Sequence, residues 1–593
     1  MTRRLAVLAG VAVLVAIPPL TGNIWIQNLL ILTFLLAIMA SGWNIMGGYA
    51  GYISLGHSAF IGVGAYTAGI LAVRWEVSPF LVAPLGGVTA AMLALVLSLA
   101  TRRTRGVAFV IVTFAMLELL GIVVSNWKGL TGGSNGLLMP LPTWAVEYQN
   151  WPFYYALLTL LALSVAMTAW IARSKLGLGL VAIRDDEDKA AGIGVRTPVY
   201  KAIAFMASAV LIGVAGAVYG YYVSFLDTSA MFDIALSMEV LLAALLGGRG
   251  TVWGPLLGAF LVQPLIELTN STLGGEDAGA IRLLLFGGLL LAVALLLPRG
   301  LLPELARLRR RRVSRTGARL AHAEVPAWLA SGRRARTGEA LVVHGLSKRF
   351  GGVRALDDAS FSAPAGSITA LIGPNGSGKT TAFNVIDGTY GLDAGRVELL
   401  GEDVTREGPT RRAFAGLGRT YQLPRLFGSL SVLENVAVAS GSFSWSGLGR
   451  IAVSGEVGGR ARELLGFVGL GEYVDARASD LSYGQRKLVE LAQVLMLDPA
   501  VILLDEPAAG INPTLVERLA ELIRALNAAG KTFVVVEHDM QFVLSLCDPV
   551  IVLSRGAVIA CDRPEIVSSD PEVLEAYLGQ DFRADPAPIE VPT

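Results

Sequence analysis

The stretch LIGPNGSGKTT, residues 371–381, contains the pattern that decides the fold of the C-terminal half. It places G-x-x-x-x-G-K-T at residues 373–380, directly after the strand-like SITALI and before the helix-like TAFNVIDG. In this context the glycines let backbone N–H groups surround phosphate oxygens at a helix N-terminus. Lys379 is expected to reach the β- and γ-phosphates, and Thr380 to ligate Mg²⁺. The predicted nucleotide-binding residues here are Gly373, Pro374, Asn375, Gly376, Ser377, Gly378, Lys379, Thr380 and Thr381.

A second stretch, VILLDEP at residues 501–507, is typical of a buried strand that ends in two carboxylates. At such a strand tip Asp505 can hold Mg²⁺, and Glu506 can orient or deprotonate the attacking water. The distance along the chain from the phosphate-binding loop leaves room for a parallel sheet and an inserted subdomain. Together the two stretches predict an α/β P-loop nucleoside triphosphatase.

The N-terminal half has a composition suited to a membrane. The chain has 593 residues, of which 53% are hydrophobic and 16% charged, whereas soluble domains carry about 25% charged residues. The apolar bias extends to about Pro298, and charges recur at ordinary density after it. We therefore expect an α-helical polytopic membrane domain over residues 1–298, followed by the triphosphatase.

Candidate spans can be placed because a membrane-crossing helix needs about 20 apolar residues. Basic residues between the spans mark the cytoplasmic side, and ten spans satisfy all of these markers. The alternative for the first span is a cleaved signal peptide. The predicted range is eight to ten spans, near residues 5–20, 24–46, 49–73, 79–100, 107–125, 154–172, 202–224, 235–248, 252–268 and 281–298.

An Arg-rich stretch, residues 299–340, is the predicted cytoplasmic linker between the halves. Directly after an apolar span, such a run follows the positive-inside rule and favours contact with anionic lipid headgroups over nucleic acid. Cys547 and Cys561 are the only cysteines, and we expect free thiols in a reducing compartment. Residues 581–593 are expected to form a disordered tail.

The stretch IRDDEDKAAGIGV, residues 183–195, concentrates charge between two predicted spans. It is expected to form a short cytoplasmic loop that contacts the triphosphatase, and simple solvation is the alternative. The candidate contact residues are Arg184, Asp185, Asp186, Glu187 and Asp188. Four residues within the spans keep no assigned role, namely His57, Glu118, Glu239 and Arg282.

The stretch LSYGQRKLVELAQVLMLDP, residues 481–499, resembles the signature of ATP-binding cassette (ABC) ATPases. Ser482, Gly484 and Gln485 match that signature, and Tyr483 replaces the commoner glycine. The resemblance implies that these residues bind the γ-phosphate of a nucleotide held by a second ATPase subunit. It covers residues 341–580, which are assigned as an ABC ATP-binding domain with ATP and Mg²⁺ as cofactors.

Four further positions match the same family in order and spacing. The resemblance implies that Gln422, in GRTYQLPRLF, senses the nucleotide, takes part in catalysis and ligates Mg²⁺ with Thr380 and Asp505. It implies that His538, in VVVEHDM, contacts the γ-phosphate beside Glu506. It also implies that Asn512, in AAGINP, lies in the loop that crosses the dimer, and that Phe350, in LSKRFGG, stacks on adenine.

The N-terminal half resembles the permeases of the branched-chain amino acid importer family. The matching stretches include WNIMGGYAGYISLGHSAFIGVGAYTAGIL at residues 43–71 and TGGSNGL at residues 131–137. In that family permease and ATPase are usually separate chains, and here they are joined. The resemblance implies that residues 184–194 dock in a groove of the ATPase beside the loop that carries Gln422.

The two resemblances together imply ATP-driven import of Leu, Ile or Val across the cytoplasmic membrane of a prokaryote. Urea, short amides and aromatic acids are alternative cargoes. The expected partners are an extracytoplasmic solute-binding protein and a second permease and ATPase, as a homodimer or a heteromer. Alternatives are an exporter half-molecule, an ATP-gated channel and a membrane-tethered regulatory ATPase that moves no solute.

Overall fold

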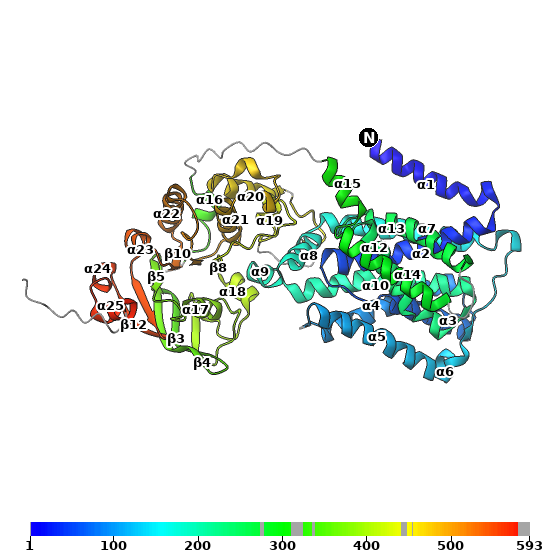
Figure 1. The fold of residues 1–593 in the computed structure, drawn as a ribbon, viewed down its shortest axis with the longest axis horizontal. Coiled ribbons are helices and arrows are strands. Elements are labelled where there is room, and N and C mark those ends of the chain that lie inside the picture. Colours follow the sequence, from blue (N-terminus) through cyan, green and yellow to red (C-terminus); the bar gives the residue numbers. More distant parts are fainter. Residues whose placement is uncertain are drawn as a thin grey trace, which may run out of the picture. The chain divides into compact units, whose positions relative to one another are not determined.

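The computed structural model describes residues 2–102, 104–272, 278–309, 324–334, 338–440, 447–453 and 455–578. The predicted tail, residues 581–593, lies outside them. The chain divides into two compact units (Figure 1). The first contains Met1–Arg184 and Pro198–Arg312, and the second contains Asp185–Thr197 and Val313–Thr593.

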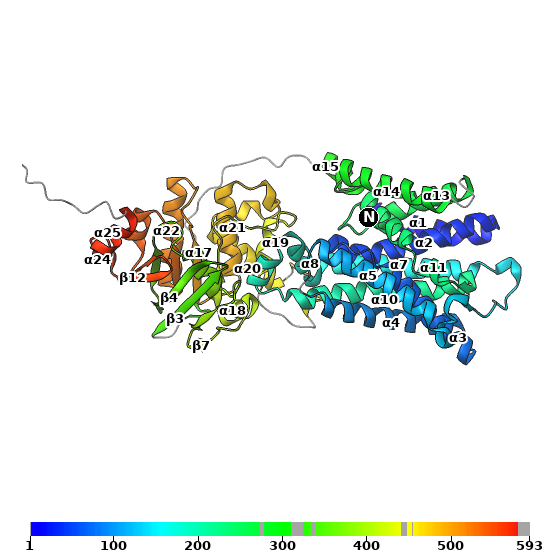
Figure 2. The same cartoon turned by 60° about the horizontal axis from the view of Figure 1, so that its bottom comes forward.

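The first unit is helical. Eight helices among the described residues are long and apolar enough to cross a membrane, and two shorter apolar helices, Leu8–Thr21 and Gly254–Thr269, fall where further spans are predicted. Helix α2 packs against α7, α12 and α13, and α3 packs against α4 (Figures 1 and 2). The main helices are α1 (Thr2–Thr21), α2 (Ile24–Trp43), α3 (Ser58–Trp75), α4 (Pro79–Ala100), α5 (Val107–Asn126), α7 (Trp151–Arg173), α8 (Lys175–Asp185), α10 (Thr197–Val223), α12 (Ile234–Gly247), α13 (Gly254–Thr272), α14 (Ala278–Leu296) and α15 (Leu301–Arg309).

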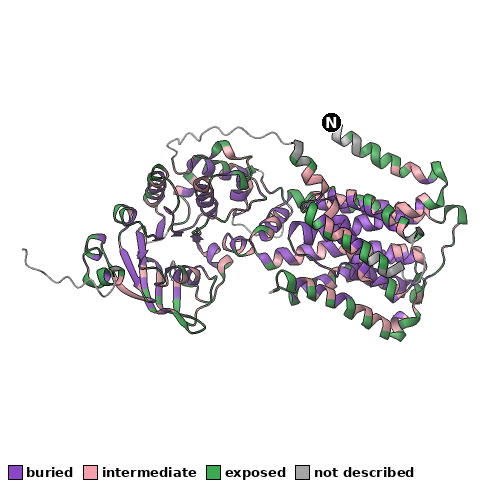
Figure 3. Ribbon diagram, viewed as in Figure 1, coloured by how far each residue is buried: buried purple, intermediate pink, exposed green. Residues whose placement is uncertain are grey.

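Small residues allow α3 and α10 to approach closely. A Cβ atom at Gly64 would lie 2.0 Å from the carbonyl oxygen of Gly213, and one at Gly216 would lie 2.3 Å from that of Ile61. At these positions any larger side chain would force the helices apart. The outer surface is different, since α5 exposes Ile111, Leu119 and Ile122 (Figure 3). An exposed apolar face of this kind suits lipid or another permease subunit.

The second and third predicted spans differ from the structure at their junction. Helix α2 continues as a π-helical turn, Asn44–Tyr49, and α3 begins only at Ser58. The non-helical stretch between them obtains hydrogen bonds from side chains: Trp43 Nε1 donates to the Ser54 carbonyl oxygen at 2.9 Å, and Leu55 N donates to Thr113 Oγ1 at 3.3 Å. Because Trp43 of α2 and Thr113 of α5 bond these backbone groups, the helix can break inside an apolar unit. Hydropathy alone does not report such a break.

The second unit contains two sheets. The six-stranded sheet has the order β12-β11-β5-β10-β9-β8, with β12 antiparallel and the other strands parallel, and an antiparallel sheet has the order β4-β3-β6-β7. Strands β5, β9 and β10 are buried throughout, as expected of parallel strands covered on both faces. The strands are β3 (Glu339–Phe350), β4 (Val353–Pro364), β5 (Ile368–Ile372), β6 (Ala394–Leu399), β7 (Glu402–Asp403), β8 (Leu417–Arg419), β9 (Val501–Asp505), β10 (Thr532–Val536), β11 (Val550–Ser554) and β12 (Ala557–Asp562).

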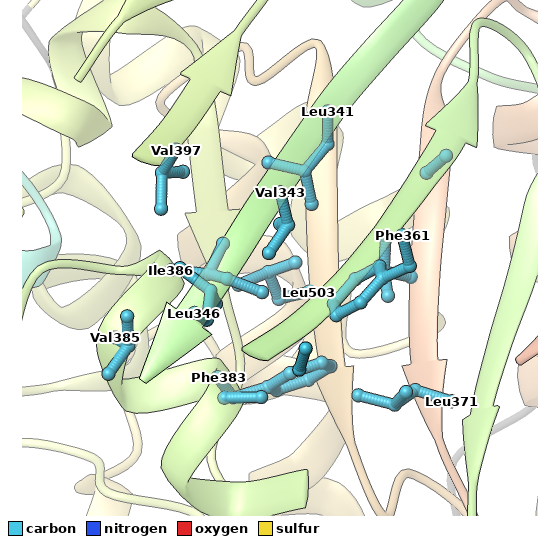
Figure 4. Close-up of a cluster of buried hydrophobic side chains, with 14 of the residues drawn as sticks. Leu341, Val343, Leu346, Phe361, Leu371, Phe383, Val385, Ile386, Val397 and Leu503 are labelled. Carbon is cyan, nitrogen blue, oxygen red and sulfur yellow. The ribbon is translucent and has the colours of Figure 1, made fainter. Parts of the chain in front are cut away.

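The main core of this unit lies between the sheets and α17. Leu341 and Val343 of the antiparallel sheet pack with Phe383 and Ile386 of α17 and Leu503 of β9 (Figure 4). This packing fixes the helix that follows the phosphate-binding loop. The helices of the unit are α9 (Glu187–Gly192), α16 (Ala327–Ala330), α17 (Lys379–Ile386), α18 (Pro409–Ala415), α19 (Val432–Ala437), α20 (Gly455–Phe467), α21 (Tyr483–Leu495), α22 (Pro513–Ala528), α23 (Met540–Leu546), α24 (Pro564–Val567) and α25 (Pro571–Leu578).

Part of the predicted linker packs on the second unit as a strap, residues 324–334. Trp328 Nε1 donates to Glu463 Oε2 at 2.9 Å on α20, and Leu329 is fully buried. The backbone N–H of Arg333 donates to Asp498 at 2.8 Å, beyond α21. The strap therefore contacts both α20 and the segment that follows α21 in the same unit.

Replacing Leu329 with Ala should destabilise the second unit. Leu→Ala at a buried site costs about 2–5 kcal/mol, so the unit should open more often. Limited proteolysis of the full-length protein in detergent measures that opening, with cleavage of the C-terminal unit expected to be faster. The control is Glu324→Ala, at an exposed position of the same segment. Equal cleavage rates for both variants would show that the strap contributes nothing to the fold.

Candidate functional site

The phosphate-binding loop connects β5 to α17. Gly373 has φ 150° and Gly378 has φ 107°. A Cβ atom would lie 2.0 Å from the carbonyl oxygen of Leu553 at the first position and 2.4 Å from that of Ala355 at the second. Both conformation and space therefore require glycine. The loop thus brings its backbone to the N-terminus of α17, where N–H groups without helical partners can meet phosphate oxygens.

Lys379 lies folded over this loop. Its Nζ donates to the carbonyl oxygens of Gly373 at 2.8 Å and Pro374 at 2.9 Å. Burial lowers the pKa of Lys379, and the nearby carboxylates of Glu506 and Asp505 act in the opposite direction. Thr380 is exposed in the first turn of α17. The amine and the hydroxyl are thus placed beside the loop in which a triphosphate would bind.

The three predicted catalytic residues meet through hydrogen bonds. Gln422 Nε2 donates to Glu506 Oε2 at 2.8 Å, and His538 Nε2 lies 3.0 Å from Glu506 Oε1. Glu506 has φ 47°, a conformation that costs free energy for a residue with a side chain and that occurs often at functional sites. The carboxylate is therefore held by side chains from two other loops.

Asp505 lies in a buried ion-pair network that the sequence did not predict. Arg419 Nη2 of β8 lies 3.4 Å from Asp505 Oδ2. Its Nη1 pairs with Asp387 and donates to Asn384 Oδ1 at 2.8 Å. Burial raises the pKa of Asp505, and Arg419 opposes the shift. The network ties β8 and the tip of β9 to the end of α17.

The oxygen donors near the loop suit Mg²⁺ bound mainly through phosphate. Among the described residues, no group of three or more His, Cys, Asp or Glu side chains could hold a metal ion alone. Mg²⁺ typically takes one or two protein oxygens and completes its shell with phosphates and water. Thr380 Oγ1 and the Asp505 carboxylate are hard oxygen donors of that type, and the donor set therefore fits the ion.

The signature residues form the start of α21. Ser482 caps the helix, with its Oγ accepting from Gln485 N at 3.3 Å while Gln485 Oε1 accepts from Ser482 N at 3.0 Å. A Cβ atom at Gly484 would lie 2.3 Å from Leu515 Cδ2, so a larger residue there would displace the Leu515 side chain of α22. The hydroxyl of Tyr483 donates to the carbonyl oxygen of Gln422 at 3.2 Å. The signature is therefore joined to the loop that carries Gln422.

Two other predicted residues bond or pack locally and lie outside the hydrogen bonds around Glu506. Asn512 caps α22 by accepting from Leu515 N at 2.9 Å. Phe350 is 44% exposed at the end of β3, with its ring 5.4 Å from that of Tyr390. An exposed ring of this kind is available to a purine base.

By its contacts, the segment Asp185–Thr197 belongs to the second unit. Asp185 accepts hydrogen bonds from Ser429 N at 2.9 Å and Ser429 Oγ at 3.0 Å. Asp186 caps α9 and pairs with Arg425 at 3.5 Å. These partners follow Gln422 in the sequence, so the segment lies beside the loop that carries it.

Other contacts change the set of residues that was predicted to contact the ATPase. Thr410 Oγ1 of α18 donates to the carbonyl oxygen of Ala191 at 3.0 Å. Arg184 belongs to the first unit, where it donates to the carbonyl oxygen of Gly48 at 2.8 Å. The next lysine, Lys189, forms an ion pair with Glu490 of α21. Neither member of that pair was predicted from the sequence, although the lysine follows directly after the four acids of the charged stretch.

Comparisons with known proteins agree with this architecture. Residues 25–294 match the family model of the permease component of the branched-chain amino acid transport system. Residues 356–509 match the ABC transporter model, and residues 557–583 match a model described as branched-chain amino acid ATP-binding cassette transporter.

Curated relatives match the ATPase part. The probable branched-chain amino acid transport ATP-binding protein LivG of Archaeoglobus fulgidus is 38% identical over 244 residues, which are 40% of this chain and 95% of the relative. The high-affinity branched-chain amino acid transport ATP-binding protein LivG of Escherichia coli K12 is 36% identical over 249 residues, 40% of this chain and 98% of the relative. A solved structure of a nucleotide-free ATP-binding cassette from an ABC transporter has 36% identity, covers 41% of this chain and 100% of its own, and has a TM-score of 0.38. This chain therefore belongs to the ABC transporters of the branched-chain amino acid transport family, with a permease component and an ATP-hydrolysing component in one polypeptide.

Proposed function

We propose that this chain imports Leu, Ile or Val into a prokaryotic cytoplasm and couples the import to ATP hydrolysis. The observation that carries the proposal is the placement of Asp185–Thr197 in the ATPase unit, beside the loop of Gln422. A segment between two permease helices that contacts a catalytic loop is suited to transmit nucleotide state to a transport pathway. The names of the curated relatives support the cargo.

Each residue of the site has a proposed role in hydrolysis. Backbone N–H groups of residues 375–378 and the Lys379 amine bind the β- and γ-phosphates. Thr380, Asp505 and Gln422 would hold Mg²⁺, which would neutralise phosphate charge when bound. Glu506 then accepts a proton from the attacking water, because its carboxylate is held between Gln422 and His538.

A second ATPase subunit completes each site. The chain has one phosphate-binding loop and one signature, so Ser482, Gly484 and Gln485 are proposed to contact a nucleotide bound by the other subunit. Phe350 stacks on the adenine, and Asn512 lies at the subunit boundary. A second permease completes the pathway, in a homodimer or a heteromer.

The cargo proposal rests on the chemistry of the spans. The candidate spans among the described residues are apolar and contain few Asp, Glu, Lys or Arg residues. A strongly charged solute would need buried partners, which are costly in a membrane. A zwitterion with an apolar side chain suits such a pathway, and urea, amides or aromatic acids are second. The longest predicted outer loop, about residues 126–153, is too short to fold around a ligand, so a separate binding protein delivers the solute.

Glu506→Gln should keep ATP binding and lose most hydrolysis. The amide preserves the size of the side chain but cannot accept a proton, and loss of a general base costs about 10²–10⁴-fold. Nucleotide binding and phosphate release by the full complex measure the two effects. Lys379→Ala should instead weaken ATP binding, and Glu517→Gln, at an exposed position on α22, is the matched control. Near-normal hydrolysis with Glu506→Gln in every subunit would remove Glu506 from this role.

Cysteines at Asp185 and Ser429 should form a disulfide, since the two side chains are in hydrogen-bond contact. The background replaces Cys561, which is exposed, with Ser. The control pair joins Asp185→Cys to Ser569→Cys, an exposed position beside α24 at the far end of the unit (Figures 1 and 2). Electrophoresis of membranes oxidised with and without nucleotide measures the yield. A yield no higher than the control in every nucleotide state would contradict the docking.

Import predicts that vesicles with the purified complex hydrolyse ATP slowly until a liganded binding protein is added. They should then accumulate Leu, Ile or Val against its gradient. Radiolabelled uptake and phosphate release, measured with a panel of binding proteins from the source genome, report both quantities. Outward movement of solute on ATP addition would contradict import, and hydrolysis without any flux would favour a regulatory ATPase.

A further inference from the structure

A lysine and a glutamate from distant parts of the chain form a buried ion pair in the second unit. Lys189 Nζ on α9 lies 2.6 Å from Glu490 Oε1 on α21, and the two side chains are 1% and 2% exposed. Burial lowers the pKa of Lys189, and the Glu490 carboxylate opposes the shift. The rings of Tyr421 and Phe427 lie 5.8 Å and 6.0 Å from the same Nζ. A charge enclosed in this way depends on its partner, since water cannot replace it.

Glu490 also holds the loop that carries Gln422. Its Oε2 accepts from the backbone N–H of Tyr421 at 3.4 Å, and its Oε1 accepts from that of Arg425 at 3.2 Å. These two residues lie on either side of Gln422, whose amide donates to Glu506. One carboxylate therefore joins the segment Asp185–Thr197, here called the permease segment, to the Gln422 loop and to α21, the helix that begins at the signature.

The side chains in the other charged contacts of the segment are more exposed than Lys189 and Glu490. Asp186 and Arg425 are 27% and 50% exposed and lie 3.5 Å apart, and pairs of that kind contribute little because water competes for both charges. Asp185 is also exposed. Lys189 is buried on α9, so a movement of the helix reaches buried groups of the ATPase through its ion pair with Glu490.

We propose that Lys189 and Glu490 are positioning residues that couple α9 to Gln422. With Lys189 in place, the Glu490 carboxylate stays oriented toward the two N–H groups that fix the loop. When α9 moves, the carboxylate moves with its counter-ion, and the loop loses one of its anchors. The proposal rests on the proposed transport function, because it names the contact that transmits the motion.

The test compares Lys189→Met, Glu490→Gln and the double variant in the full complex. Either single variant should lower the ratio of transported solute to hydrolysed ATP by about fivefold or more, the range of typical coupling between sites. The double variant should be no worse than the singles, because all three lack the same interaction. It also leaves no unpaired buried charge, so it folds where a single variant fails. Lys128→Met, at an exposed lysine of the first unit, is the control for the substitution type.

A reversed pair, Lys189→Glu with Glu490→Lys, separates docking from loop control. It restores an ion pair, but a lysine cannot accept the N–H groups of Tyr421 and Arg425. The disulfide between cysteines at positions 185 and 429 should therefore form as in the complex with the native ion pair. The ratio of transported solute to hydrolysed ATP should stay low. Full recovery of the ratio would overturn the role of Glu490 in the loop, as would additive losses in the double variant.

Hydrogen–deuterium exchange gives a readout that needs no cargo. Residues 420–427 should exchange faster in Lys189→Met than in the unmodified complex, because the loop has lost an anchor. Unchanged exchange would overturn the inference even in a complex that transports. Absence of transport by the unmodified complex, with faster exchange in the variant, would instead contradict the proposed function and leave the coupling contact supported.

Discussion

The buried guanidinium of Arg419 is the group on which the nucleotide site depends. It lies between Asp387 at the end of α17 and Asp505 at the tip of β9. Without it two buried carboxylates would face each other unpaired, and breaking such a network costs about 3–5 kcal/mol. Arg419 also ends β8, from which the Gln422 loop begins. One side chain therefore sets the relative positions of the phosphate-binding loop, the Asp505 carboxylate and the loop that carries Gln422.

The buried ion pair of Lys189 and Glu490 lies next to the Arg419 network. Tyr421 separates them: its ring is 5.0 Å from the Arg419 guanidinium and 5.8 Å from Lys189 Nζ. The loop between β8 and α19 is therefore held on one side by the nucleotide site and on the other by the permease segment. Tyr483, which replaces the commoner glycine of the signature, adds a hydrogen bond to the Gln422 carbonyl oxygen. A loop with three such anchors can respond to changes at each of them.

The sequence predicted the parts of the fold that depend on local pattern. The phosphate-binding loop, the buried strand before Asp505 and the positions of the apolar helices follow from residue type and periodicity. The contacts of Arg419 and Lys189 do not, because each partner is distant along the chain and any carboxylate could have served. The break before Ser58 was missed because hydropathy does not report the hydrogen bonds that Trp43 and Thr113 of α5 make with its backbone. The strap was hidden by its arginines, although Trp328 and Leu329 already indicated apolar contact there.

Fusion of the two components changes what the docking contact must achieve. A tether between two surfaces replaces a bimolecular encounter by an effective concentration that reaches the millimolar range for short flexible linkers. The segment Asp185–Thr197 therefore needs little affinity of its own, and it presents only one helix, α9, of six residues. What it does need is a defined register, because a shift of the segment would separate Lys189 from Glu490, which bonds the loop that carries Gln422. An exposed pair tolerates such a shift, since water replaces the lost contact. A buried lysine does not, because its charge has one partner within reach, and the ion pair with Glu490 is thus better suited to specify position than to supply binding energy.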